Sequence, residues 1–173
     1  TDDWFVYEKI PGRGFSRGDD VDGALAMIDE LHSFDLENCG WDDRKVTAED
    51  YAFDGLPESL EPGPVSIELT NNGTEYHELA LIRKQDGTTE GFGEILAIED
   101  EEQQQAKAQF FGGIPALPPG EAAYAVVDLT PGEYLIACFL AVGSTPEAYE
   151  AGPVEGQPHL SKGMARQINV SAA

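Results

Sequence analysis

Alternation of apolar and polar residues is the dominant pattern from about residue 45 onward. Residues 65–70 (Val-Ser-Ile-Glu-Leu-Thr) are apolar at every second position, which is the period of a strand with one buried face. Turn-forming residues such as Pro131-Gly132 separate similar segments from one another. About seven such strands spaced by turns predict an all-β Greek-key sandwich. The other clear segments are residues 45–53, 77–82, 122–129, 134–140 and 167–170.

Residues 1–43 lack this period and are predicted to form an N-terminal extension to one main domain, residues 44–173. Within the extension, apolar residues recur three or four positions apart at residues 19–34, which indicates a helix. Asp19 or Asp20 can cap this helix, because a short acidic side chain accepts hydrogen bonds from the N–H groups of the first turn. We expect the apolar face of the helix to pack on the domain.

A second helix is expected inside the β domain. Residues 94–111 consist largely of good helix formers, including a run of Glu and Gln, and contain no Gly or Pro. Residues 112–120, rich in Gly and Pro, are expected to form a loop after it. The predicted architecture is therefore a β-sandwich with an N-terminal helical extension and one inserted helix.

The composition is that of a folded and strongly acidic protein. The 173 residues are 41% hydrophobic, enough for one good core. Acidic residues outnumber basic ones by 33 to 10, and the net charge of −23 excludes nucleic acid as a partner because both surfaces are negative. The same charge would steer a basic partner protein at low salt, or suit a protein that lives in high salt. No apolar run reaches the roughly 18 residues of a membrane span.

The last third of the chain carries residues with soft-metal chemistry. Cys138 follows an apolar segment, and a long polar loop then leads to His159 and Met164 in the pattern His-x4-Met. Thiolate and thioether sulfur favour copper, and two imidazoles with one thiolate and a weak axial thioether form the blue-copper electron-transfer arrangement. A second imidazole is needed, and His77, between two apolar runs, is the candidate.

In these motifs the sequence resembles the cupredoxin family, over about residues 44–170. The resemblance rests on Asn71-x-Gly73 followed by a His at a strand start, on Pro-Gly-x-Tyr leading to a Cys, and on His-x4-Met before the last strand. It implies a cupredoxin-like sandwich that binds one copper ion and carries electrons. The implied ligands are His77 and His159 as equatorial imidazoles, Cys138 as the thiolate and Met164 as the axial thioether.

The sequence looks closest to exported bacterial members of the family that have a long loop between the Cys and the His. Twenty residues separate Cys138 from His159 here, where well-characterised cupredoxins have only a few. The resemblance thus implies an extracytoplasmic protein, whether secreted, periplasmic or at the cell surface. Its acidic surface would orient a basic redox partner.

The sequence also allows two other classes of function. In an oxidising compartment two cysteines favour a single disulfide, and a Cys39–Cys138 bond would leave a metal-free binding or assembly module instead of a metal thiolate. An enzyme is the other class. Three histidines cannot build the additional copper centres of a multicopper oxidase, and the sequence has no nucleophile-elbow, zinc-protease, phosphate-loop or dinucleotide motif. We therefore predict no catalytic turnover.

Overall fold

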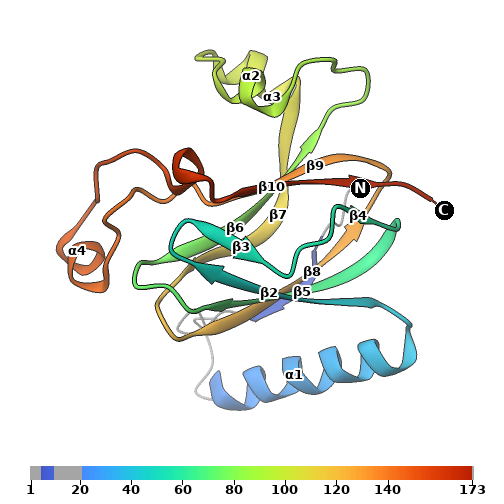
Figure 1. The fold of residues 1–173 in the computed structure, drawn as a ribbon. Helices are drawn as coiled ribbons and strands as arrows, with labels where there is room; N and C mark the ends of the chain where they lie inside the picture. Colours follow the sequence, from blue (N-terminus) through green and yellow to red (C-terminus); the bar gives the residue numbers. More distant parts are fainter. Residues whose placement is uncertain (1–4, 10–20, 173) are drawn as a thin grey trace.

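The computed structural model describes residues 5–9 and 21–172, which form two five-stranded β-sheets packed face to face (Figure 1). The predicted all-β sandwich is confirmed, with ten strands in the described residues. The strand order is β1-β8-β5-β2-β3 in the first sheet and β4-β10-β9-β6-β7 in the second. The strands are β1 (Phe5–Lys9), β2 (Asp42–Glu49), β3 (Ala52–Asp54), β4 (Ser59–Leu60), β5 (Gly63–Asn71), β6 (His77–Lys84), β7 (Ala108–Leu117), β8 (Ala122–Leu129), β9 (Gly132–Ala137) and β10 (Ala165–Val170).

The chain passes repeatedly from one sheet to the other. It leaves the first sheet after β5, forms β6 and β7 in the second, returns for β8 and ends in the second sheet with β9 and β10. Strand β9 lies in the middle of the second sheet, antiparallel to β10 on one side and to β6 on the other. The ends of β9, β6 and β10 are therefore brought together, although they are far apart in the sequence.

Both faces of β9 are covered, which explains its apolar run Tyr134-Leu-Ile-Ala137. Ile136 packs in the core between the sheets, whereas Leu135 and Ala137 pack on the opposite side in a second cluster with Phe92. Because side chains alternate along a strand, the residue after β9, Cys138, returns to the inner side. It is fully buried in the main core.

The N-terminal helix extends further than its sequence pattern indicated. Helix α1 spans Val21–Asn38, against the expected residues 19–34, and its proposed capping residues Asp19 and Asp20 lie outside the described residues. Figure 1 shows α1 along the outer side of the first sheet. No helix in the described part of the chain, α1 included, is both long enough and apolar enough to cross a membrane.

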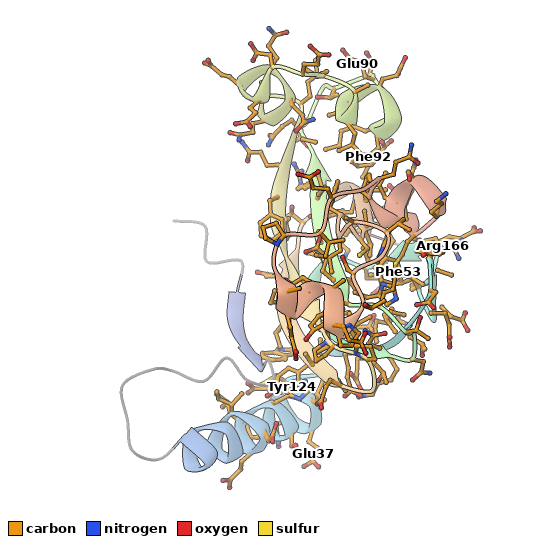
Figure 2. The ribbon with its side chains drawn as sticks, turned by 90° about the vertical axis from the view of Figure 1, so that its left-hand side faces the viewer. Glu37, Phe53, Glu90, Phe92, Tyr124 and Arg166 are labelled. Atoms are coloured by element: carbon orange, nitrogen blue, oxygen red, sulfur yellow. The ribbon has the colours of Figure 1, made fainter. Side chains whose placement is uncertain are left out.

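One histidine of α1 fixes the helix to the sheet. The ring of His32 stacks on Tyr124 of β8 with centroids 3.9 Å apart, and its Nε2 lies 2.6 Å from the hydroxyl of Ser66 on β5. Figure 2 shows Tyr124 beside α1, on the side of the molecule opposite to α2. His32 thus packs helix α1 onto the first sheet.

The single helix expected at residues 94–111 is wrong. Two short helices, α2 (Phe92–Leu96) and α3 (Glu101–Gln105), occupy part of that range, and β7 begins at Ala108. The local sequence favours a helix. Strand β7 forms instead because it pairs with β6 through seven residue pairs, and this pairing outweighs the local helix propensity. Phe92 and its helix then cover the outer side of β9 (Figure 2).

The loop expected at residues 112–120 is also wrong for most of its length, because β7 continues to Leu117. Glycine here permits close strand pairing. Gly113 has φ +142°, and a Cβ at this position would lie 1.9 Å from the carbonyl oxygen of Leu79 on β6. Only glycine can bring the two strands this close with that backbone conformation.

The segment 45–53, expected as one strand, is a hairpin of β2 and β3. Tyr51 sits between them with φ +68°, a left-handed conformation that reverses the chain.

In the loop before the last strand lies the short helix α4 (Pro146–Ala151), whose first turn is capped by the Thr145 hydroxyl.

Candidate metal centre

Three of the four predicted ligands lie at the ends of neighbouring strands of the second sheet, and the fourth, His159, lies in the turn that leads into β10. His77 opens β6, Cys138 directly follows β9, His159 begins a 3-10 helix (His159–Lys162), and Met164 directly precedes β10. All four residues have an exposed fraction of 0%. Any metal bound here would be enclosed by protein.

Three of the four present donor atoms to one another. The Nδ1 atoms of His77 and His159 are 3.1 Å apart, and the Sγ of Cys138 is 3.3 Å from Nδ1 of His159. All three donor atoms lie within 4.8 Å of one another. Two imidazole nitrogens and one sulfur in this arrangement can share a single metal ion.

Met164 is tied to the same group through its backbone. Its N–H donates to the carbonyl of His159 at 3.3 Å, and its own carbonyl accepts from the N–H of Cys138 at 3.2 Å. Its side chain belongs to the same buried cluster as Cys138. The position suits a fourth, weaker ligand, and the axial role of the thioether stays a prediction.

The long loop returns to its own beginning before it delivers His159. The N–H of His159 donates to the carbonyl of Leu140 at 2.8 Å, and Ala141 pairs with Pro158 in an isolated antiparallel bridge. The residues on either side of the loop are thereby fixed to each other. The twenty-residue separation thus does not prevent His159 from reaching Cys138.

Each imidazole turns its other nitrogen to a carboxylate. Nε2 of His159 is 3.0 Å from Oε2 of Glu75, and Nε2 of His77 is 3.3 Å from Oδ1 of Asp50. An imidazole that donates Nε2–H to a carboxylate keeps the lone pair of Nδ1 for a metal. The two carboxylates therefore select the tautomers in which both Nδ1 atoms are available to the shared site.

Glu75 is itself held in place by several donors. The hydroxyl of Tyr51 donates to one carboxylate oxygen at 2.8 Å, and the N–H groups of Gly143 and Ser144 donate to the other at 2.7 and 3.0 Å. Burial acts to raise the pKa of Glu75, but the hydrogen bonds, including the one from His159, outweigh it and lower that pKa. Glu75 is therefore a fixed negative charge at neutral pH.

Asp50 has the same role beside His77. Burial again acts to raise its pKa, and hydrogen bonds from the hydroxyl and N–H of Thr74 and from His77 bring that pKa below its usual value. Gly73 packs directly on this pair: a Cβ there would lie 2.5 Å from both Asp50 Oδ1 and His77 Nε2. The Asn71-x-Gly73 motif thus includes a glycine for which the site leaves no room for a side chain.

Burial keeps the imidazole of His77 and the thiol of Cys138 neutral when no metal is bound. It lowers the pKa of His77, and it raises the pKa of the Cys138 thiol to about 11, more than the N–H of Glu78 directed at the sulfur can offset. A metal must therefore displace the thiol proton when it binds.

The structure does not contain the Cys39–Cys138 disulfide of the alternative hypothesis. Both thiols are free: Cys39 is exposed just after α1, where its Sγ lies 3.7 Å from a carboxylate oxygen of Asp35, and Cys138 is buried in the core. Cys39 lies between α1 and β2 of the first sheet, whereas Cys138 follows β9 of the second sheet and is buried with its sulfur 3.3 Å from Nδ1 of His159.

The sequence motifs indicate His77, Cys138, His159 and Met164 as candidate ligands, but they do not indicate the carboxylates of Asp50 and Glu75. Acidic residues number 33, so no single one stands out in the sequence. The usable signal for Glu75 was its place two residues before His77, since a metal-bound imidazole commonly donates its second N–H to a carboxylate. Asp50 has no such signal, because the β2–β3 hairpin alone brings it to the site.

No protein-family model matches the sequence, and no curated protein matches it. Solved structures do. Dithionite-reduced auracyanin from Roseiflexus castenholzii is 19% identical over 75% of this chain and 97% of its own, with a TM-score of 0.45. Auracyanin A, a "blue" copper protein from Chloroflexus aurantiacus, is 17% identical over 75% and 98%, with a TM-score of 0.38. A purple cupredoxin from Nitrosopumilus maritimus is 14% identical over 75% and 100%, also at 0.38.

These neighbours are cupredoxins, the family that the sequence motifs resemble. Every TM-score is below 0.5 and every identity below 20%, so the likenesses are not evidence of a shared function. What the chain can do is decided by its own buried group of two histidines and one cysteine.

Proposed function

We propose that the chain binds one copper ion through His77, Cys138 and His159, with Met164 as a weak axial ligand, and carries single electrons. One observation carries the proposal: two Nδ1 atoms and one sulfur converge in a buried site while both Nε2 atoms face carboxylates. Sulfur and imidazole donors favour copper over magnesium, calcium or manganese, which prefer oxygen.

The bound ion would supply the one-electron change of charge, and the protein's own groups prepare the site for it. Glu75 and Asp50 orient the two rings. Complete burial of the ligands excludes water, and the strands to which they are attached hold them in place. Cys138 gives up its proton on loading and provides the negatively charged sulfur ligand.

We propose an electron carrier in preference to an enzyme because the chain has only three histidines and the third, His32, packs against Tyr124 on the first sheet. The chain therefore lacks the imidazoles for a further copper centre. We also propose an extracytoplasmic location, supported by the resemblance of the motifs to exported cupredoxins, and a basic redox partner, supported by the net charge of −23.

Voltammetry of the copper-loaded protein tests electron carriage. We expect one reversible one-electron couple that persists over repeated cycles, because the same buried ligands hold both oxidation states. His159→Ala should abolish it, whereas His32→Gln, a matched change of a histidine outside the site, should leave it in place. An irreversible couple, or loss of copper on reduction, would contradict the proposal.

A further inference from the structure

A buried redox centre needs a place on the surface through which electrons enter and leave. We propose that this place is the groove between Phe110 and Phe139, and that it receives a redox protein presenting an apolar patch ringed by Lys and Arg. The inference rests on the proposed copper site, and it names the docking face and the chemistry of the partner.

The ligands themselves offer no exposed edge to a partner. His77, Cys138, His159 and Met164 are all 0% exposed. The outer nitrogen of His159 is covered by Glu75, and its ring contacts Tyr51 edge to face with centroids 5.2 Å apart. Electrons must therefore pass through residues next to the ligands.

Phe139 provides a short path from the thiolate to the surface. It directly follows Cys138 in the chain, and its side chain is 37% exposed. Its N–H donates to Oε1 of Glu78 at 2.9 Å, and the N–H of Glu78 is directed at the Cys138 sulfur at 3.5 Å. Two routes thus join the sulfur to the same patch of surface: a covalent route along the backbone from Cys138 to Phe139, and a hydrogen-bonded route through Glu78.

A hollow of about 650 Å³ lies at this patch, between the second sheet and helices α2 and α3. Phe110, 59% exposed, stands between this hollow and a smaller one of about 260 Å³, and Glu78 borders both. Exposed aromatic residues around a largely apolar hollow are typical of a protein-interaction surface. The larger hollow is lined mainly by apolar side chains, among them Ala80, Ile82, Ile95, Leu96, Phe110 and Phe139.

The wall formed by α2 and α3 presents Ile95, Leu96, Gln104 and Gln105 to the hollow, and the rest of this segment is strongly acidic. Between residues 90 and 110, Lys107 is the only basic residue, and it pairs with Glu90. Figure 2 shows Glu90 at the end of the molecule opposite to α1. A partner with Lys or Arg around an apolar centre would match this wall, and Glu78 would meet a cation inside the groove. The acidic residues are Glu90, Glu94, Glu99, Asp100, Glu101 and Glu102.

A rival face exists on α4. Tyr76, next to His77, stacks on Tyr149 of α4 with centroids 4.2 Å apart, and Tyr149 is 39% exposed. This face also carries acids, so charge does not separate the two. The groove is favoured because it begins at the thiolate ligand and because its hollow can receive a protruding apolar side chain.

A binding footprint on the metal-free protein tests the location without relying on copper. We would add unlabelled cytochrome c, a basic haem protein, to the ¹⁵N-labelled chain at low salt and follow the amide signals by NMR. We expect shifts confined to residues 78–82, 92–110 and 139–140. These shifts should disappear in about 0.5 M salt, because that salt concentration screens the attraction between the acidic chain and basic cytochrome c. A footprint on α4, or none, would overturn the inference.

Matched variants then connect docking to electron transfer. Phe110→Ala and the pair Glu101→Lys with Glu102→Lys should each slow reduction of the copper-loaded protein by cytochrome c about tenfold at low salt. On the rival face, Tyr149→Ala and the pair Glu147→Lys with Glu150→Lys should change the rate less than about twofold. Larger effects from the α4 variants than from the groove variants would overturn the docking face but leave the proposed function standing. Failure of the protein to bind copper would overturn the proposed function alone, because the docking footprint is measured without metal.

Discussion

Replacing Glu75 with Gln removes a buried negative charge while keeping the shape of the side chain. Glu75 is only 8% exposed, and its Oε2 lies 3.0 Å from Nε2 of His159. The amide oxygen of Gln can still accept from that nitrogen, so ring orientation should survive. The change therefore isolates the effect of charge on the proposed copper site.

The magnitude follows from Coulomb's law. The carboxylate lies 3.0 Å from Nε2 of His159. With about 2 Å across the ring and about 2 Å for a metal–nitrogen bond, a bound ion would lie about 7 Å from the charge. One unit charge at that separation contributes about 2.4 kcal/mol at an effective dielectric constant of about 20. Because a negative charge stabilises the more positive oxidised state, Glu75→Gln should raise the one-electron reduction potential by about 100 mV.

The assay is voltammetry of the copper-loaded variant beside the unchanged protein. Glu37→Gln, an exposed position on α1 far from α2 and α3 (Figure 2), is the matched control and should shift the potential by less than about 10 mV. Asp50→Asn should also raise the potential, but by less, since Asp50 is more exposed. A potential for Glu75→Gln that stays within about 20 mV of the original, or falls, would refute this account of the carboxylates.

Three further predictions concern the protonation and packing of the structure. Because the Cys138 thiol has a pKa of about 11, its proton must leave on loading, so copper affinity measured by competition should rise about tenfold per pH unit from pH 7 to 9; a flat profile would contradict this. Gly73→Ala should lower the free energy of unfolding by about 1–3 kcal/mol in urea titrations and weaken copper binding, because its Cβ would clash with His77; unchanged values would show that the turn can move. His32→Ala should cost about 2 kcal/mol of unfolding free energy by removing the contacts to Ser66, yet leave the copper potential unchanged; a shifted potential would contradict the separation of the two sites.

The strands that carry the site could be predicted because their alternation is a local signal. Residues 65–70 and 77–82 fall within β5 and β6, and the strand predicted at residues 134–140 corresponds to β9, which ends earlier, at Ala137. The candidate ligands stand out in the sequence for a different reason: Cys, His and Met are infrequent in this chain and have distinct metal chemistry.

Other features depend on contacts between distant residues, which no local pattern records. The sequence of strand β7 predicts a helix and a loop because the pairing of β7 with β6 gives no signal in its own Gln-Phe-Phe-Gly-Gly segment. The contact of Asp50 with His77 depends on the fold of the β2–β3 hairpin, and that of Glu75 with His159 depends on the return of a twenty-residue loop. The two carboxylates could be recognised only in three dimensions.

The most direct test of the proposed site is to add Cu(II) to the reduced, metal-free protein and record its visible spectrum. We predict one intense thiolate-to-copper absorption band that saturates at one copper per chain and is absent in Cys138→Ser, while Cys39→Ser keeps it. Absence of the band, or a band that survives Cys138→Ser, would contradict a copper site built on Cys138, His77 and His159.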